Sequence, residues 1–267
     1  MKSLTLPDDR ILAYRDQGDG PPLVMLHGWS MSSAVFSEAI DHFSSSFRVL
    51  APDLRGHGKS SPDQGYTLDD LAADLLVWLE RLGIENLNLL GWSLGGQVAL
   101  VLAQRLGARV DRLILNATTP RFAASGDWAC GLPAGQVRAM ARNLKRDYRR
   151  TMEEFFHLQF AGEDLSRERL RSIVAFAVRQ SKLPEPEVGL ACLQTLEDED
   201  QRSLLAETSC PTLVLQGTED RITVPAAAEY LAVSLPKARL SMLQSVGHAP
   251  FLSRPEETFR QWQDFLI

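Results

Sequence analysis

The 267-residue chain is poor in cysteine, and its three cysteines, Cys130, Cys192 and Cys210, lie far apart. Their odd number and wide spacing fit neither a disulfide framework nor a metal-binding motif, so we expect reduced, mostly buried thiols in a cytoplasmic protein. No apolar run is long enough to span a membrane. The first residues lack an apolar stretch followed by a small-residue cleavage site, and we expect no signal peptide.

An excess of positive charge is also absent, because the formal net charge is −6 and the isoelectric point is near 5.4. Such a chain has no general attraction for nucleic acid or for an anionic membrane, so we expect neither as a partner. Internal repeats and low-complexity segments are lacking. With 45% hydrophobic and 23% charged residues, the composition predicts one globular, enzyme-sized body, and we expect a monomer.

Short apolar segments alternate with helical segments along the chain, which is typical of a mainly parallel sheet covered by helices. A helix is predicted over 68–82, with Thr67 as its cap and Gly83 at its end. An antiparallel hairpin at 4–6 and 11–14 is expected at the edge of the sheet. The further predicted strands are residues 23–26, 48–51, 87–90, 113–115, 212–215 and 240–243.

From about residue 118 to residue 196 the strand-like segments disappear and helical periodicity takes over. We therefore expect residues 1–117 and 197–267 to form the core domain and residues 118–196 to form a helical lid inserted between two strands. The acidic run at 197–200 predicts a solvated loop or the start of a helix rather than a metal site.

The most informative motif is Gly-Trp-Ser-Leu-Gly-Gly at residues 91–96, between a predicted strand and a predicted helix. A tight turn at this place would expose the hydroxyl of Ser93 to a substrate carbonyl and to a base. Gly91 and Gly95 would let the chain pass close to itself. Leu94 begins the helix, so its N–H is free to bind a developing oxyanion.

A nucleophilic serine needs a base, and the base needs an acid that orients it. His248 follows the last predicted strand and precedes the C-terminal helix, and we assign it as the base. Asp220 lies at the carboxyl end of the strand 212–215 and is the predicted acid, with its neighbour Glu219 as the alternative. The nucleophile, acid and base then follow one another in the order Ser93, Asp220, His248.

The other histidines are assigned structural roles. For His27 we expect the backbone to matter more than the imidazole, and for His57, in a turn-rich loop, a structural or gating role. His42 and His157 lie on helical segments and are expected to pack or to face solvent. The loop after His27 should supply the second oxyanion donor, and we nominate the N–H of Trp29, whose side chain would also form a pocket wall.

Taken together, five motifs resemble those of the α/β-hydrolase superfamily over nearly the whole chain. They are His-Gly-Trp at 27–29, Asp-Leu-Arg-Gly-His-Gly-Lys-Ser at 53–60, the serine motif at 91–96, Gly-Thr-Glu-Asp at 217–220 and Gly-His-Ala-Pro at 247–250. The resemblance implies a mostly parallel eight-stranded sheet flanked by helices. It also implies a catalytic triad of Ser93, Asp220 and His248 that requires no metal or organic cofactor.

Shorter motifs resemble the BioH family, the pimeloyl-acyl-carrier-protein methyl ester esterases of biotin biosynthesis. They lie at residues 91–96, 116–122, 127–128 and 247–251. The resemblance implies a carboxylesterase whose basic lid faces an acidic acyl carrier protein. Phe155 would then lie near the acyl chain, and Arg150, Arg167 and Arg171 would be basic lid positions. Glu154 departs from the family, which has a basic residue there.

The charge of the lid agrees with that implication. Residues 121–182 contain twelve Lys or Arg and seven Asp or Glu, a local excess of five positive charges in an acidic chain. The spacing of Arg142, Arg146, Arg149 and Arg150 predicts that most of them share one helix face, and Arg167 and Arg171 are one turn apart. A solvated basic face and a docking face for an acidic carrier both fit this pattern, and the resemblance favours the carrier.

Other functions on the same scaffold stay open. Dehalogenases and epoxide hydrolases need an aspartate nucleophile, so Ser93 argues against both. Generalist short-chain carboxylesterases, carbon–carbon bond hydrolases and perhydrolases all keep a serine. A ligand receptor is the alternative outside enzymes, and the intact set of Ser93, Asp220 and His248 argues against it.

Overall fold

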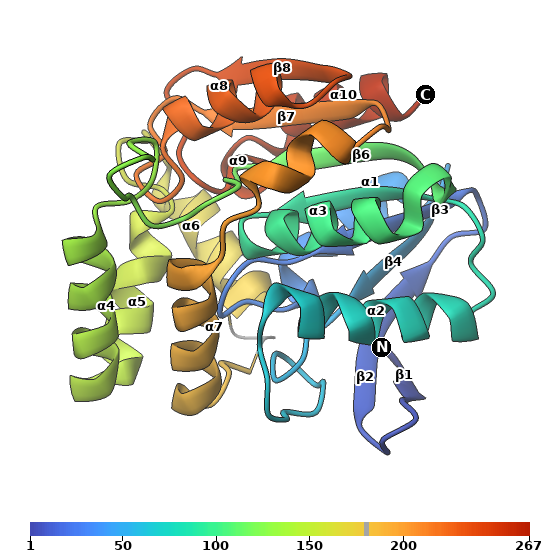
Figure 1. Cartoon of the computed structure of the whole chain (residues 1–267), viewed down its shortest axis with the longest axis horizontal. Coiled ribbons are helices and arrows are strands. Elements are labelled where there is room, and N and C mark those ends of the chain that lie inside the picture. Colours follow the sequence, from blue (N-terminus) through green and yellow to red (C-terminus); the bar gives the residue numbers. More distant parts are fainter. Residues whose placement is uncertain (179–181) are drawn as a thin grey trace.

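In the computed structural model of the protein, which describes residues 1–178 and 182–267, eight strands form one sheet in the order β1-β2-β4-β3-β5-β6-β7-β8 (Figure 1). The strands are β1 (Lys2–Thr5), β2 (Ile11–Gln17), β3 (Pro22–Leu26), β4 (Arg48–Pro52), β5 (Leu87–Trp92), β6 (Val110–Asn116), β7 (Thr212–Gly217) and β8 (Ala238–Leu243). β2 pairs antiparallel with β1 and β4. The other neighbours pair in parallel, which confirms the predicted sheet and its edge hairpin.

Helices connect the strands of the parallel part, and two more follow the last strand. They are α1 (Ser37–Phe43), α2 (Leu68–Arg81), α3 (Leu94–Leu106), α4 (Ala134–Arg146), α5 (Tyr148–Leu158), α6 (Arg167–Ile173), α7 (Pro186–Asp198), α8 (Pro225–Ser234), α9 (Pro250–Ser253) and α10 (Pro255–Leu266). Shorter turns are the 3-10 helices η1 (Ser33–Phe36), η2 (Gly107–Arg109) and η4 (Arg202–Glu207) and the π-helix η3 (Val174–Val178).

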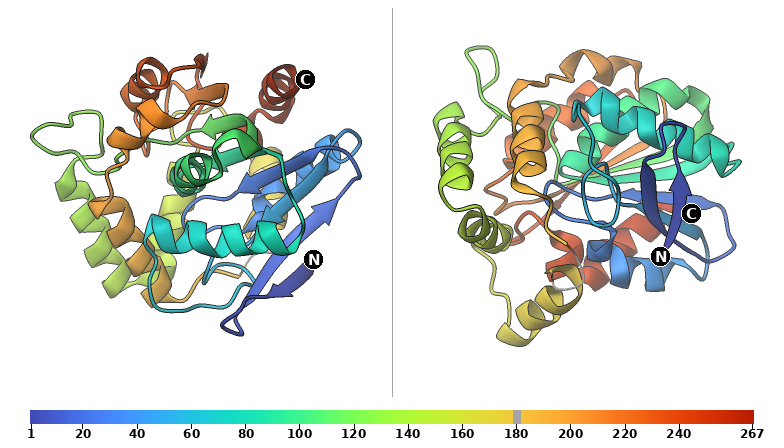
Figure 2. Two further views of the ribbon diagram at one scale, coloured as in Figure 1. Left: turned by 45° about the vertical axis from the view of Figure 1, so that its right-hand side comes forward. Right: turned by 90° about the horizontal axis from the view of Figure 1, so that it is seen from below.

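Helices cover both faces of the sheet, which gives three layers (Figure 2). The core on one face includes Trp78 of α2, Leu102 of α3 and Leu231 of α8. The core on the other face includes Phe43 of α1 and Trp262 of α10. Successive residues of a strand point to opposite faces, and both faces of the sheet are covered, so central strands such as β3 and β5 are mostly apolar rather than alternating.

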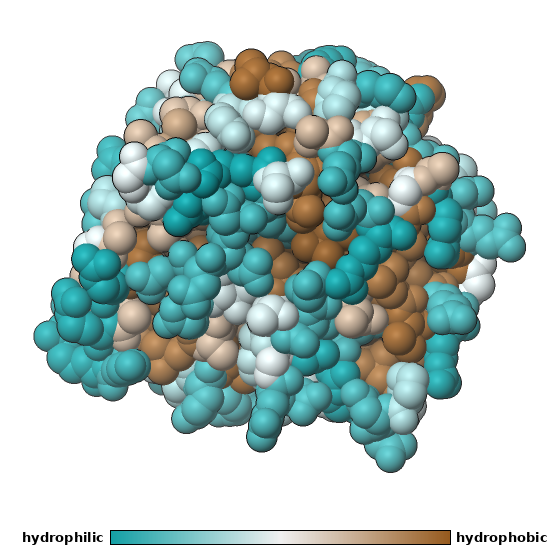
Figure 3. Space-filling model, viewed as in Figure 1, coloured by the Kyte–Doolittle hydropathy of each residue, from teal (hydrophilic) through white to brown (hydrophobic). Residues whose placement is uncertain are grey.

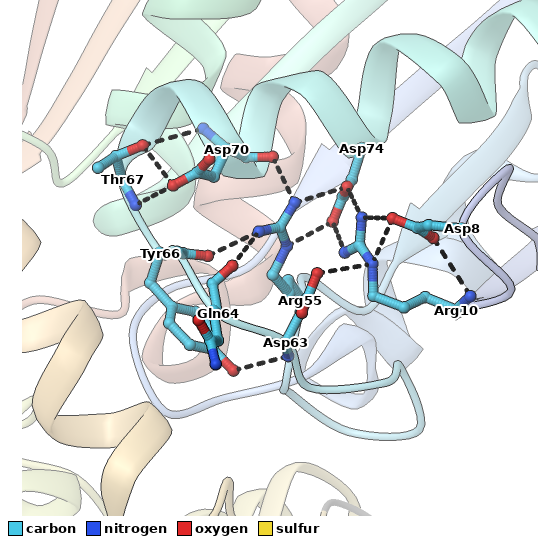
Figure 4. A network of polar contacts seen from close by, with 10 residues as sticks. Asp8, Arg10, Arg55, Asp63, Gln64, Tyr66, Thr67, Asp70 and Asp74 are labelled. Atoms are coloured by element: carbon cyan, nitrogen blue, oxygen red, sulfur yellow. Dashed lines mark hydrogen bonds and ion pairs between the residues drawn. The ribbon is translucent and has the colours of Figure 1, made fainter.

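α2 begins at the predicted cap and is tied to two other segments. The Thr67 hydroxyl accepts a hydrogen bond from the Asp70 N–H at 3.1 Å, and the Asp70 carboxylate accepts one from the Thr67 N–H at 3.0 Å, which forms a capping box. One turn later, the Asp74 carboxylate accepts hydrogen bonds from Arg55 and Arg10 (Figure 4). These bonds join α2 to the loop after β4 and to the start of β2.

The segment between β6 and β7 is helical, as the periodicity predicts. α4 packs against α5 and α7 at one end of the molecule (Figure 1). The bidentate ion pair of Arg169 in α6 with Glu38 in α1 connects this segment to the helices of the core. We refer to residues 118–196 as the lid, and the division into a core and a lid stays a prediction.

One prediction about the lid arginines is wrong. Arg142 and Arg146 lie on α4, whereas Arg149 and Arg150 lie on α5, so no more than two of the four can share one helix face. Asp147 separates the two helices, because its carboxylate accepts a hydrogen bond from the Arg150 N–H at 3.1 Å and caps α5.

The acidic run 197–200 lies at the end of a helix rather than at the start of one. α7 ends at Asp198, and Asp200, two residues later, pairs with Arg202 and Arg121. The last residue of the run therefore finds its counter-charges in Arg202 and Arg121.

Hydrophilic residues cover most of the face shown in Figure 3, and they stand out at the lower left, where Figure 1 places α4 and α5. Within the described ranges, no helix combines the length and the apolar character that crossing a membrane would require.

Candidate active site

Ser93 lies in the turn between β5 and α3, as the motif predicts. Its φ of +56° and ψ of −121° are a backbone conformation that is costly for a residue with a side chain. Glycines on either side leave room for this turn. A Cβ on Gly91 would lie 2.3 Å from the carbonyl oxygen of Gly95, and a Cβ on Gly95 would lie 2.2 Å from that of Leu26. The start of α3 therefore packs directly on the end of β3.

The loop after β3 borders Ser93. A Cβ on Gly28 would lie 3.1 Å from the Ser93 Cβ, so this part of the loop is in close contact with the serine. Leu94 is the first residue of α3, and its N–H has no acceptor one turn earlier in the helix. The backbone N–H of Trp29 is not a donor in any of the turn and loop hydrogen bonds between backbone groups of the described residues. Both predicted oxyanion donors thus belong to segments that flank Ser93.

The imidazoles of His27 and His57 hold this loop, so the ring of His27 has a structural role beside the backbone role that the sequence predicts. His27 Nε2 accepts a hydrogen bond from the Leu54 N–H at 2.9 Å, and its Nδ1 donates to the Gly28 carbonyl at 2.9 Å. His57 Nε2 accepts from the Ser30 N–H at 3.3 Å. Burial lowers the pKa of His27 to about 4 and that of His57 to about 3, so both rings are neutral at pH 7.

Asp220 and His248 form a buried pair. The Asp220 Oδ2 lies 2.8 Å from the His248 Nδ1, whereas the His248 Nε2 has no hydrogen-bond partner among the described residues. One ring nitrogen is therefore fixed and the other is available. Glu219, the alternative acid, lies beside Gly162 of the lid instead. Around this pair, as elsewhere in the ranges described, acidic, histidine and cysteine side chains form no cluster suited to a metal ion.

The sequence interpretation missed the residues that hold Asp220. Its Oδ1 accepts hydrogen bonds from the N–H groups of Ile222 and Thr223 at 2.8 and 3.0 Å. Its Oδ2 accepts from the Thr223 hydroxyl and from the Gln216 amide, both at 2.8 Å. Bonds from an aspartate to N–H groups two and three residues later are a local turn motif. The signal for Gln216 was a polar side chain in an otherwise apolar strand.

The loop that carries His248 is fixed to the serine turn and to the lid. The Trp92 indole N–H donates to the His248 carbonyl at 2.9 Å, and the two rings lie 5.6 Å apart. On the other side, the His248 N–H donates to the carbonyl of Gln159 in the lid at 2.8 Å. Because Trp92 directly precedes Ser93, these contacts bring the predicted base and the predicted nucleophile to one place.

A cavity of about 320 Å³ lies between the lid and the core, lined mostly by apolar side chains. Phe155, which is predicted to lie near an acyl chain, lines it and packs edge-on against Trp29, with ring centroids 4.8 Å apart. The Trp29 indole N–H donates to the Gly189 carbonyl of α7 at 2.9 Å, which fixes the ring. The other lining residues are Ser30, Met31, Arg149, Met152, Glu153, Phe156, His157, Val174, Ala177, Val178 and Leu183.

The three arginines predicted to contact a carrier are exposed and lie outside the lining of this cavity. Arg150 pairs with Glu154 at 2.9 Å, so the residue that departs from the family pattern neutralises its neighbour. Arg167 and Arg171 lie one turn apart on α6 and form no ion pair with any residue in the described ranges. Their contact with a carrier stays a prediction.

Comparison with known proteins agrees with this geometry. A family model of the alpha/beta hydrolase fold matches residues 21–255. The chain is 38% identical over 240 residues to a pimeloyl-[acyl-carrier protein] methyl ester esterase of Nitrosomonas europaea, covering 90% of this chain and 93% of that protein. It is 36% identical over 242 residues to the Aromatoleum aromaticum protein of the same name, covering 89% and 94%.

Among solved structures, the esterase EaEST from Exiguobacterium antarcticum superposes with a TM-score of 0.91 at 25% identity, over 98% of each chain. The enol-lactonase from Burkholderia xenovorans shares the fold, with a TM-score of 0.84 at 23% identity over 99% of each chain. The chain belongs to the alpha/beta hydrolase family and, within it, to the pimeloyl-[acyl-carrier protein] methyl ester esterases.

Proposed function

We propose that this protein is a serine carboxylesterase that hydrolyses the methyl ester of pimeloyl-[acyl-carrier protein], the reaction that gives its relatives their name. The observation that carries the chemistry is the buried pair of Asp220 and His248, whose Nε2 is unpartnered among the described residues. An imidazole held in this way by its Nδ1 is suited to take a proton from a serine at its Nε2. The relatives supply the choice of substrate.

In the first half of the reaction, the Ser93 Oγ attacks the ester carbonyl carbon and the His248 Nε2 takes its proton. Asp220 stabilises the imidazolium that forms. The N–H groups of Leu94 and Trp29 donate hydrogen bonds to the oxyanion of the tetrahedral intermediate. When the intermediate collapses, the bond to the methoxy oxygen breaks, and methanol leaves with the proton from His248.

In the second half, water attacks the acyl-enzyme and gives its proton to His248. The second tetrahedral intermediate collapses, Ser93 recovers its proton, and the free acid leaves. The apolar cavity beside Trp29 and Phe155 would bind the methylene chain of the substrate, since burial of apolar surface favours such binding.

The proposal includes an acidic carrier that docks on the lid through Arg150, Arg167 and Arg171. The local excess of positive charge on this segment supports it, because opposite charges on two partners speed and orient their association. We also place the enzyme in the cytoplasm and, as the resemblance to the BioH family implies, in biotin biosynthesis. The three free cysteines support a reducing compartment.

The first test compares two substrates with purified protein. We expect the carrier-linked pimeloyl methyl ester to be hydrolysed with a kcat/KM at least tenfold above that of a short free methyl ester. Ser93→Ala should fold normally, by circular dichroism and thermal unfolding, and should lose hydrolysis of both. Equal turnover of the two esters would instead favour a generalist esterase, and activity retained by Ser93→Ala would refute the assignment of the nucleophile.

The second test asks whether the reaction occurs in cells. In a bacterial strain blocked at the methyl-ester removal step of biotin synthesis, expression of this chain should restore growth without biotin. Expression of Ser93→Ala at the same level should not. Growth with neither protein, although both are soluble and abundant, would argue against the proposed substrate.

A further inference from the structure

The lid contacts the loop of His248 through two neighbouring backbone N–H groups. The Gly247 N–H donates to the Glu163 carboxylate at 2.8 Å, and the His248 N–H donates to the Gln159 carbonyl at 2.8 Å. The fit is close, since a Cβ on Gly247 would lie 2.5 Å from the Gln159 oxygen and 2.8 Å from the Glu163 Oε1. Both acceptors belong to the segment that follows α5, which we call the lid clamp (residues 159–163).

The lid clamp complements the contacts from the core. On the core side, the His248 carbonyl accepts from the Trp92 indole, and the imidazole Nδ1 bonds to Asp220. Neither contact fixes the peptide plane that precedes His248. The N–H of this peptide, that of His248, is bonded to Gln159 in the clamp. The peptide before it donates its Gly247 N–H to Glu163 in the clamp and accepts at its Val246 carbonyl from the Glu219 N–H of the core at 2.9 Å. The clamp thus bonds to two successive peptides ahead of His248, and this is how it can set the place of the ring.

The carboxyl group of Glu163 is costly to place at this contact, because it is partly removed from water. It is half-buried, and burial raises its pKa above the ordinary value. The Ser253 side chain and the Gly247 N–H beside it offset only part of this rise in the pKa. The neighbouring Asp164 is exposed and has no contact of this kind with the described residues. A buried carboxylate therefore occupies the position where its charge strengthens the bond from the Gly247 N–H.

We propose that Glu163 is a positioning residue for His248, which holds the catalytic loop in place only when the lid is closed. This role rests on the proposed function of Ser93 and His248. Glu163 itself touches no reacting atom. A displaced lid would release the peptide before His248, so the Nε2 would lose its alignment with the serine, and hydrolysis would depend on lid closure even for an ester too small to contact the lid.

The test uses Glu163→Ala and Glu163→Leu, which remove the acceptor, and Glu163→Gln, which keeps an acceptor oxygen but not the charge. Asp164→Ala is the matched control. With p-nitrophenyl acetate, we expect kcat to fall about tenfold in the Ala and Leu variants, with KM changed less than twofold. Glu163→Gln should stay within about threefold of wild type and Asp164→Ala at the wild-type value.

A second readout is independent of turnover. Hydrogen exchange of the peptide containing Gly247 and His248 should be faster in the Ala and Leu variants than in Glu163→Gln, while exchange of α2 stays unchanged. Unchanged exchange in Ala and Leu would overturn the inference even in an inactive protein. Faster exchange with an unchanged kcat would refute the positioning role alone. The proposed function would fail separately, if wild type showed no hydrolysis that depends on Ser93.

Discussion

His27 and His57 are buried next to each other, with ring centroids 5.3 Å apart, and both serve the loop that carries Trp29. Each uses its Nε2 as an acceptor for a backbone N–H. Only the neutral form of the imidazole can accept at that nitrogen, so a proton on either ring would break a bond that shapes the loop after β3. Burial prevents this at neutral pH, because it lowers both pKa values.

We predict that the buried His57 makes the free energy of unfolding depend on pH. The unfolded chain takes up a proton at this histidine near pH 6.5, whereas the native state does so only near its pKa of about 3. Between these values the unfolded state binds more protons, so stability falls as the pH falls. From pH 7 to pH 5 this effect amounts to about 2 kcal/mol. Urea unfolding at pH 7 and at pH 5 should show that the free energy of unfolding falls by about 2 kcal/mol less in His57→Asn than in wild type.

The control for this measurement is His42→Asn. His42 is exposed and packs its ring against Phe43 and Phe259, so its replacement should leave the pH dependence of stability as in wild type. A His57→Asn variant with the full wild-type dependence would contradict the neutral, accepting role of His57.

At the scale of elements, one carboxylate joins three segments. Asp74 in α2 accepts from Arg55 at 2.7 and 2.8 Å and from Arg10 at 2.7 Å (Figure 4). The carbonyl of Arg55 in turn accepts from the His57 Nδ1 at 2.9 Å. The ion pairs on α2 are therefore connected to the loop after β3 through His57.

We predict that Asp74→Asn lowers the free energy of unfolding by about 3 kcal/mol, because it leaves the guanidinium of Arg55 buried without its counter-charge. The side chains of Asp74 and Arg55 are only 9% and 6% exposed. Urea unfolding measures the change. Asp69→Asn, on the same helix but 72% exposed in its pair with Arg105, should cost less than about 1 kcal/mol. Equal losses in the two variants would show that burial of the pair does not matter.

Elements were predictable where their signals are local. The start of α2 follows from Thr67 and Asp70, three residues apart, and the turn at Ser93 follows from its glycines. The break between α4 and α5 was missed, although Asp147 is a good helix cap, because arginines at helical spacing on both sides suggested one continuous helix. Competition between a cap and a periodic pattern is settled by packing, here of α4 against both α5 and α7.

At the scale of the whole molecule, the order of the motifs predicted which loops meet, since the carboxyl ends of parallel strands share one edge of the sheet. Contacts between the lid and the core could not be predicted in this way. Glu163 and Gly247 are 84 residues apart, and Arg169 and Glu38 are 131 residues apart. No periodicity or local motif encodes such pairs, because they depend on how the inserted helices settle on the core.

Charge is also distributed unevenly over the molecule. The structure shows which of the lid arginines on α5 and α6 are paired with a carboxylate of the described residues and which are not. On α5, Arg149 and Arg150 are each paired with a glutamate one turn later. On α6, Arg167 and Arg171 have no such partner within the described ranges. An acidic carrier would therefore be attracted more strongly by α6 than by α5, although α5 lines the cavity.

We predict that the double variant Arg167→Glu with Arg171→Glu lowers kcat/KM for the carrier-linked ester about tenfold at low salt, mainly through KM, because two attractive charges become repulsive. Screening shortens to about 3 Å at 1 M salt, so the difference from wild type should shrink there. Glu154→Gln frees Arg150 and should raise kcat/KM for the same substrate about threefold. Stopped assays that measure released methanol at both salt concentrations provide the comparison.

Two controls separate docking from catalysis in this experiment. A short free methyl ester has no carrier, so all of these variants should hydrolyse it at the wild-type rate. Arg239→Glu makes the same change of charge at an exposed position of β8, outside the lid, and it should leave the carrier-linked reaction unchanged. If Arg239→Glu weakened that reaction as much as a single change on α6, the net charge of the protein rather than the α6 arginines would attract the carrier.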